Sequence, residues 1–132
     1  MTATTSDPVT LVAALRNILE DTERDFGSMP FFVRPMVRRG FAGRTGQDLE
    51  EWRRLASALL SEVRSDTEPA RVRERHPGLR EKLERLAENY RTAPERASRG
   101  MGALAGTLQS VTEASRRREQ AVRALITWLG QA

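Results

Sequence analysis

The amino-acid sequence predicts an all-α protein of four to five helices, in a bundle or an elongated coiled-coil-like dimer, with a long C-terminal helix. Apolar residues recur at intervals of three and four along most of the chain, which is the spacing of one helix face. β-branched residues never alternate with polar ones over a useful length, so no strand is expected. The 132 residues and their 39% apolar content fit a single helical domain, residues 1–132, with one modest core.

The first helix is expected over residues 7–25. Asp7 suits the N-cap, and Pro8 suits the first helical turn, where its missing N–H would have no partner in any case. The apolar stripe that follows consists of Leu11, Val12, Leu15, Ile18 and Leu19. This helix should end before Gly27.

A short helix rich in Phe and Arg is expected over residues 28–41. Ser28 would cap it, and Pro35 is tolerable only close to its start, because proline disrupts a helix interior. Beyond this helix the chain is loosened by three glycines, Gly40, Gly43 and Gly46.

The next helix is expected over residues 48–64 and is indicated by Thr45 and Asp48 at its start. Its apolar stripe is Leu49, Trp52, Ala56, Leu59 and Val63. Intervals of 3, 4, 3 and 4 are those of a coiled-coil seam. Residues 69–75 are a candidate for a short helix. A further helix is predicted over residues 78–92 by the stripe Leu79, Leu83, Leu86 and Tyr90.

Residues 94–129 keep the same alternation and predict a long last helix. Ser115 and Arg118 interrupt its stripe, so the helix is either continuous or broken between Ser110 and Ser115. A continuous helix would be about 54 Å long at ~1.5 Å per residue. Because that exceeds the span of a small domain, its stripe would need a partner chain or a long flank of the other helices. Together with the heptad spacing, this length favours a homo-oligomer.

The net charge of +4 is unevenly distributed. Residues 1–25 and 48–68 each carry −3, residues 26–47 carry +4 without any acid, and residues 69–93 and 94–132 carry +3 each. Acidic and basic helices of this kind would attract one another within a bundle or between subunits. Of the 22 basic residues 21 are arginine, which is compatible with phosphate or carboxylate binding.

The sequence lacks the residues that several classes of function require, namely metal binding, catalysis and membrane spanning. There is no cysteine, and the only histidine, His76, is followed by Pro77 in a turn, so no metal site and no cofactor are expected. No nucleophile is accompanied by a base, so the protein is not expected to be an enzyme. No apolar run approaches the ~20 residues of a membrane span, and the first residues do not resemble a secretory signal. A cytoplasmic location is therefore expected.

All four phenylalanines fall within sixteen residues, in the segment FGSMPFFVRPMVRRGFAGRTG at 26–46. Aromatic, Met and Arg side chains are enriched in recognition surfaces. This segment therefore predicts a docking site for a protein partner, formed by Phe31, Phe32, Arg34, Met36, Arg38, Arg39 and Phe41. The structural alternative is that the apolar residues of this segment close one end of a bundle while its arginines reach outward.

Two further interpretations stay open for the basic residues. The first is phosphate contact in nucleic acid by Arg116, Arg117, Arg118 and Arg123, together with Arg34, Arg38 and Arg39. Their alternative role is ion pairing with the acidic helices. The second is contact with a membrane surface. Independently, Gly102 and Gly106 lie one helical turn apart and predict a close helix crossing.

The string Pro30-Phe-Phe-Val-Arg34 with Val37-Arg38 resembles the opening P-x-F-V-R-x-x-V-R of the small C-terminal helical domain in light-independent protochlorophyllide reductase. The resemblance covers nine residues and ends where Gly40, Gly43 and Gly46 replace a helical continuation. It implies no function for this chain. The sequence as a whole predicts a non-catalytic adaptor, scaffold or regulatory subunit that self-associates and docks a protein partner.

Overall fold

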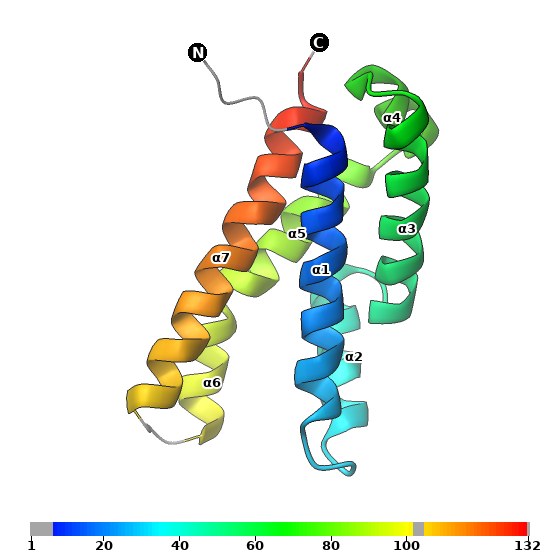
Figure 1. The fold of residues 1–132 in the computed structure, drawn as a ribbon. Helices are drawn as coiled ribbons and strands as arrows, with labels where there is room; N and C mark the ends of the chain where they lie inside the picture. The colour runs from blue at the N-terminus through cyan, green and yellow to red at the C-terminus, as the bar shows by residue number, and fades with distance from the viewer. Residues whose placement is uncertain (1–6, 102–104, 132) are drawn as a thin grey trace.

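The computed structural model describes the backbone of residues 7–101 and 105–131, and the side chains of these residues except 98, 100, 101 and 105–108. The described part contains seven helices and no strand (Figure 1). In chain order they are α1 (Pro8–Gly27), α2 (Arg34–Thr45), α3 (Leu49–Ser65), α4 (Pro69–Arg75), α5 (Leu79–Arg91), α6 (Ala93–Met101) and α7 (Ala105–Leu129). The predicted all-α class and long C-terminal helix are confirmed, whereas the predicted number of four to five helices is too small.

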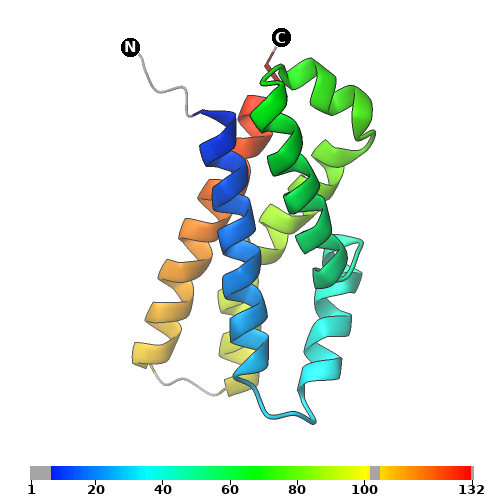
Figure 2. The same cartoon turned by 45° about the vertical axis from the view of Figure 1, so that its right-hand side comes forward.

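The long helices pack side by side. α1 lies between α3 and α7, and α5 packs mainly against α7 and also against α2 (Figures 1 and 2). α6 continues the chain beyond α5 and packs along the N-terminal half of α7. At this end of the molecule the helices separate into two legs, one formed by α2 with the C-terminal half of α1, the other by α6 with α7 (Figure 1).

The core is built from the stripes that the sequence shows. Along α3 the buried residues include Leu49, Trp52, Ala56, Leu59 and Val63, and along α5 they include Leu79, Leu83, Leu86 and Tyr90. Burial of such side chains contributes about 1.5–3 kcal/mol each relative to exposure. Because these stripes face other helices of the same chain, the seams that predicted coiled-coil pairing are already covered.

The corner between α2 and α3 is fixed by a small buried polar network. The indole N–H of Trp52 donates a hydrogen bond to the Thr45 hydroxyl over 2.9 Å. That hydroxyl lies 2.9 Å from the carbonyl oxygens of Phe41 and Gln47, so it can donate to either of them. A buried indole needs such an acceptor, and Thr45 supplies it at the end of α2.

The second helix differs from its prediction at both ends. It was expected over residues 28–41 but begins at Arg34 and ends at Thr45. Pro35 explains the start, because it cannot donate an amide hydrogen bond and its ring collides with the carbonyl four residues earlier. The helix therefore cannot extend a full turn before Pro35.

The end of α2 lies at Gly46, whose φ of 93° is in the left-handed region that favours glycine. Gly40 and Gly43, which were expected to loosen the chain, lie inside α2 instead. Each glycine costs a helix about 1 kcal/mol relative to alanine. Burial of Phe41 and Thr45 on the same helix offsets that cost.

The expected helix over residues 94–129 is not one rod. α6 ends at Met101 and α7 begins at Ala105, and the two helices lie side by side rather than end to end (Figure 1). The alternative of a break between Ser110 and Ser115 is wrong, because α7 runs through these residues without interruption. With 25 residues α7 is about 37 Å long. α7 packs against α1, α4, α5 and α6 of the same chain, so its length does not require a partner chain.

None of the helices in residues 7–101 and 105–131 combines the length and the apolar character that crossing a bilayer would require.

Candidate binding site: an apolar tip and the groove beside it

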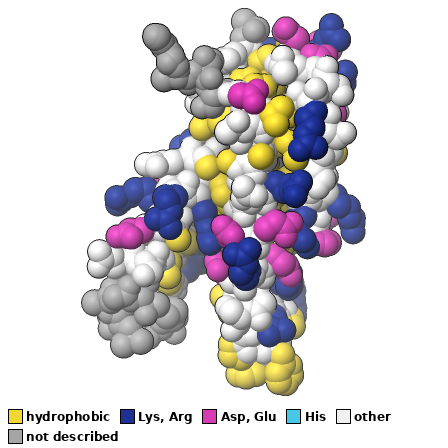
Figure 3. Space-filling view, in the orientation of Figure 1, with side chains coloured by type: hydrophobic (Ala, Val, Ile, Leu, Met, Phe, Trp, Pro, Cys, Tyr) yellow, Lys and Arg dark blue, Asp and Glu magenta, His cyan; other side chains and the backbone are white. Residues whose placement is uncertain are grey.

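The turn between α1 and α2 carries an exposed apolar cluster. The amide of Val33 donates to the carbonyl of Pro30 over 2.9 Å, and this turn presents Phe31 and Phe32 at its corners. Their side chains are 78% and 73% exposed, and Met36, at the start of α2, is 67% exposed. We call Phe31, Phe32 and Met36 the apolar tip. Figure 3 shows hydrophobic side chains gathered at the end of this leg.

The geometry of the apolar tip is ordered. The rings of Phe31 and Phe32 meet edge to face with their centroids 5.9 Å apart. The guanidinium of Arg34 donates hydrogen bonds to the carbonyl oxygens of Met29, over 2.8 Å, and Gly27, over 2.7 Å. Arg34 therefore holds the loop that carries both rings, and it does not point outward as a free cation.

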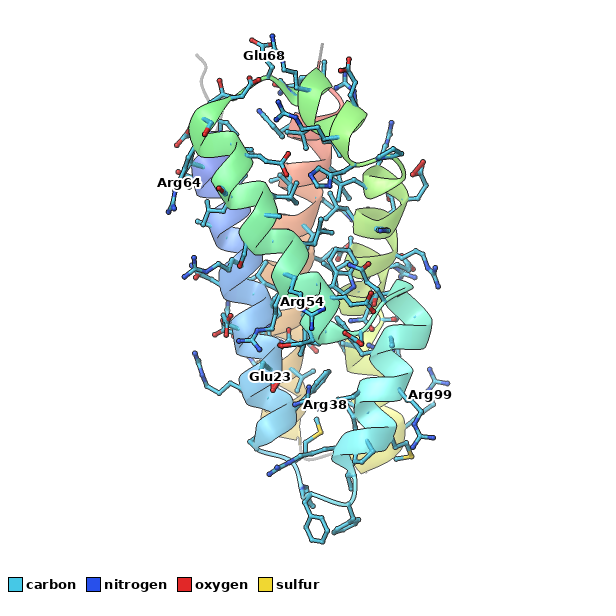
Figure 4. The ribbon with its side chains drawn as sticks, turned by 90° about the vertical axis from the view of Figure 1, so that its right-hand side faces the viewer. Glu23, Arg38, Arg54, Arg64, Glu68 and Arg99 are labelled. Carbon is cyan, nitrogen blue, oxygen red and sulfur yellow. The ribbon has the colours of Figure 1, made fainter. Side chains whose placement is uncertain are left out.

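Arg38 is likewise engaged inside the molecule. Its guanidinium donates two hydrogen bonds to the carboxylate of Glu23 on α1, over 2.9 and 2.6 Å, and lies 5.7 Å from the ring centroid of Phe26 (Figure 4). This hydrogen bonding lowers the pKa of Glu23 and raises the pKa of Arg38. Arg38 thus joins α2 to α1, and Arg39 is left as an exposed arginine with no bonding partner in the described part of the chain.

Phe41 was predicted to contact a partner, and this prediction is wrong. Its side chain is 1% exposed, and its ring meets that of Phe26 edge to face at 5.8 Å. Phe41 lies five residues along α2 from Met36, on the face of α2 that contacts α1 and α5. Both interpretations of the Phe-rich segment therefore apply to part of it. Phe26 and Phe41 belong to the core, whereas Phe31 and Phe32 are exposed.

A groove with a volume of about 1000 Å³ opens between the two legs. Figure 3 shows this hollow, with the apolar tip at the end of one side. One wall is formed by Met29, Val33, Met36 and Val37. The opposite wall is formed by Ala93, Ala97, Val111 and Ala114. Met36 belongs to both the tip and the groove, so the two features are adjacent.

The floor of the groove is polar, and Tyr90 and Thr22 lie within it. Their hydroxyl oxygens are 2.7 Å apart, and the Thr22 hydroxyl also donates to the carbonyl of Ile18 over 2.8 Å. Thr22 is then the acceptor and Tyr90 the donor of the shared bond. Burial raises the pKa of Tyr90 to about 12, against the opposing effects of the Thr22 hydrogen bond and the charge of Arg118.

Two arginines meet at the same floor. The Nε of Arg44 donates to the side-chain oxygen of Asn89 over 2.7 Å, and Arg96 donates to the same oxygen over 3.2 Å. Arg96 also donates to the backbone carbonyl of Asn89 over 2.8 Å and to the hydroxyl of Thr92 over 2.6 Å. We call Arg44 and Arg96 the arginine pair. Neither guanidinium forms an ion pair with any described carboxylate, and all 18 acidic residues of the chain are described.

The pKa values of the arginine pair reflect, first of all, the burial of both guanidinium groups. Burial lowers the pKa of Arg44. Burial, and then the neighbouring positive charges of Arg44 and Arg99, lower the pKa of Arg96 to about 10, while the negative charge of Glu95 acts in the opposite direction. Both residues stay protonated at neutral pH, so two positive charges face one neutral amide.

The C-terminal arginines do not form one free basic surface. Arg118 pairs with Asp25 over 2.9 Å and lies 5.9 Å from the ring centroid of Tyr90. Arg123 pairs with Glu119 over 2.7 Å and lies 3.5 Å from Glu84 on α5. The remaining two, Arg116 and Arg117, are exposed and have no bonding partner among the described residues. The ion-pair interpretation therefore applies to two of the four arginines.

The predicted helix crossing at Gly102 and Gly106 is not placed by this structure. Gly102 lies outside the described residues, and at Gly106 only the helical backbone of α7 is described. In the same described ranges, no cluster of His, Asp and Glu side chains could hold a metal ion.

Sequence reasoning did not identify the floor of the groove. Neither Arg44 nor Arg96 is among the residues that the sequence predicts to form a site. The available signal was Asn89, a polar residue beside Tyr90 on the apolar face of α5. A buried amide on such a face requires hydrogen-bond partners from other elements. Which residues these are depends on how α2 and α6 approach α5.

Comparison of this chain with family models, with curated proteins and with solved structures found no match.

Proposed function

We propose that this protein is a non-catalytic adaptor or scaffold that docks a protein partner by inserting its apolar tip into an apolar pocket. The observation that carries the proposal is the exposure of Phe31, Phe32 and Met36 at one end of the molecule. Large apolar side chains clustered on an exposed surface mark interaction sites. Aromatic residues that fill a partner's pocket commonly supply most of the binding free energy.

The tip is suited to this use because its rings are already positioned. Arg34 fixes the loop through two backbone carbonyls, and the two rings support one another. A preorganised loop loses less conformational entropy on binding than a free one. Each ring that becomes buried in a partner would contribute about 1.5–3 kcal/mol before the costs of association.

The positive charge around the tip indicates that the rim of the partner's pocket is acidic. Residues 26–47 contain no acid, and Arg39 is exposed one turn along α2 from the tip. An acidic residue at the rim would meet Arg39 and fix the orientation of binding. The mechanism is thus apolar anchoring by the tip with orientation by Arg39, while Arg34 and Arg38 serve to position the segment.

Self-association remains a separate prediction. Within the described ranges the large exposed apolar side chains are those of the tip, so a second copy of the chain would use the same surface. Light scattering on the purified chain, with and without the tip substitutions, distinguishes a dimer through the tip from a monomer.

The first test separates docking from core packing. Phe31→Ser combined with Phe32→Ser should change the free energy of unfolding by less than about 0.5 kcal/mol, because both rings are exposed. The matched control, Phe41→Ala, should cost about 3–5 kcal/mol, because that ring is buried. Urea denaturation measures both. If the double substitution unfolds the chain, the tip is part of the core and the docking proposal fails.

The second test identifies the occupant. A photo-crosslinking amino acid replaces Phe32 in the intact chain. The matched control carries the same amino acid in place of Arg64, an exposed residue at the C-terminal end of α3. We expect a crosslinked protein at position 32 only, and its loss when Phe31→Ser is added. Crosslinking that is equal at both positions contradicts the proposal.

Binding of the chain to vesicles is a separate measurement. If the chain binds vesicles only when they contain anionic lipid, the occupant of the tip is a membrane surface and not a protein.

A further inference from the structure

We propose that the groove between the two legs binds a small amphipathic carboxylate, with the carboxylate at the arginine pair and an aliphatic body against the apolar walls. The inference goes beyond the docking function, because the residues it uses at the floor and walls do not include Phe31 or Phe32. It rests on three features: an unneutralised pair of cations, their unused hydrogen-bond donors, and the size and lining of the groove.

The charges provide the first step. The arginines that contact α1 from α2, α3 and α7 have carboxylate partners, such as Arg38 with Glu23, Arg53 with Glu20 and Arg118 with Asp25. The arginine pair has none, although every acid of the chain is described. Two partly desolvated cations that repel one another make an anion at this point favourable.

The hydrogen bonds provide the second step. Arg96 uses both terminal nitrogens on Thr92 and Asn89, at the C-terminal end of α5. Arg44 uses only its Nε, so its two terminal nitrogens have no bonding partner among the described residues. A guanidinium whose terminal N–H groups are unoccupied presents the fork that a carboxylate accepts in a bidentate manner.

Gly40 accounts for the position of that fork. A Cβ at residue 40 would lie 2.9 Å from a terminal nitrogen of Arg44. The glycine therefore lets the guanidinium lie back against its own helix, inside the groove. Glycine inside a helix lowers the stability of that helix. The close approach of the Arg44 guanidinium gives a reason why residue 40 is nevertheless glycine.

The groove itself provides the third step. Its volume of about 1000 Å³ is at the upper end of the ~300–1000 Å³ that is usual for small-molecule sites. The walls are aliphatic, and the two methionines among them can adapt to ligand shape. The arginine pair meets at Asn89 on the floor, whereas the other two charged residues that line the groove, Asp25 and Arg118, are paired with each other. A ligand with one anionic end and one apolar body matches this distribution.

Other occupants fit these features less well. The tip of a second copy would bring the basic segment 26–47 against the arginine pair, which places like charges together. A phosphate ester has three terminal oxygens, of which the planar fork of Arg44 pairs with two at a time, and the hydroxyl proton of Tyr90 is committed to Thr22 and does not serve the third. A carboxylate has two oxygens in one plane, which the fork of Arg44 can satisfy.

Calorimetry on the intact chain tests the inference with three ten-carbon probes: decanoate, decanol and decyl phosphate. We expect saturable binding of decanoate that is at least about tenfold tighter than that of decanol, which corresponds to about 1.4 kcal/mol. Decyl phosphate should bind more weakly than decanoate. Equal affinities for decanoate and decanol, or no saturable binding of decanoate, would overturn the proposal.

Variants locate the site. Arg44→Gln should weaken decanoate binding at least about tenfold while leaving decanol binding unchanged. Ala114→Phe fills the groove and should abolish binding of both probes, whereas the matched control Arg64→Gln should change neither. Because Arg96 also supports the end of α5, it is replaced by Lys, which keeps the charge, and folding is checked by circular dichroism. Equal losses in Arg44→Gln and Arg64→Gln would mean non-specific attraction.

Failure of the groove proposal can be distinguished from failure of the docking proposal by measuring decanoate binding in the tip variant. The chain with Phe31→Ser and Phe32→Ser should bind decanoate as the unchanged chain does, because neither ring lines the groove. If this double substitution removes decanoate binding, the ligand occupies the tip and the groove assignment is wrong.

Discussion

Tyr90 connects the core of the molecule to the floor of the groove, and it is the only tyrosine in the chain. Its phenol is buried and hydrogen-bonded to Thr22, a residue 68 positions away in the sequence. The titration of tyrosinate absorbance therefore reports on one known site without any labelling.

We predict that Tyr90 ionises near pH 12 in the folded chain and near its ordinary value of 10.0 in urea. Because the folded pKa is the higher one, the unfolded chain loses its proton first as the pH rises. The free energy of unfolding should then fall progressively between about pH 10 and about pH 12, by roughly 3 kcal/mol at most. Ultraviolet titration and urea denaturation over this range measure the two effects.

Tyr90→Phe is the control for this prediction. It removes the ionisable group, so the part of the alkaline destabilisation that belongs to Tyr90 should disappear. At neutral pH the same change should cost about 1 kcal/mol through the lost hydrogen bond to Thr22. A native titration midpoint near pH 10 would show that the phenol is accessible to solvent, contrary to the structure.

At the scale of one helix, α3 shows how a local signal sets a boundary. The carboxylate of Asp48 accepts a hydrogen bond from the Glu51 amide over 2.9 Å, and the Glu51 carboxylate lies 3.4 Å from the Asp48 amide. This reciprocal arrangement satisfies donors that the first turn of a helix leaves unpaired.

We predict that Asp48→Ala lowers the free energy of unfolding by about 1 kcal/mol, because it removes the cap. Asp48→Ser should retain most of the stability, since a serine hydroxyl can accept the same hydrogen bond. Thermal and urea unfolding of the two variants measure the difference. If serine were as costly as alanine, the carboxylate would act through its charge rather than through the cap.

For the whole molecule, α6 differs from the body in how much it buries. α3 has six buried residues, whereas no described side chain of α6 is buried. Local opening costs less where few apolar groups leave water. The wall that α6 contributes to the groove therefore belongs to the less stable part of the fold, as ligand-binding elements often do.

Hydrogen exchange should reveal this difference. We predict that the amides of α6 between residues 95 and 99 exchange at least about tenfold faster than those in the centre of α3. Decanoate should slow exchange in α6 more than in α3 if it binds in the groove. Equal protection of α3 and α6 without ligand would show that α6 unfolds only together with the body.

The sequence by itself determined the helical class, the stripes of α1, α3 and α5 that form the core, and the start of α3. These features depend on spacing and capping within a single segment, so neighbouring residues are sufficient to specify them. Pro35 also carries enough information to place the start of α2, because proline excludes a full helical turn before it.

The tertiary structure alone decided the features that bear on function. Phe31 and Phe41 belong to one short segment, yet one is exposed and the other buried, because only residue 41 lies on the face of α2 that meets α1 and α5. The same holds for the arginine pair, where Arg44 from α2 and Arg96 from α6 meet at Asn89 on α5. Such meetings depend on the packing of whole helices, and no local pattern in the sequence encodes them.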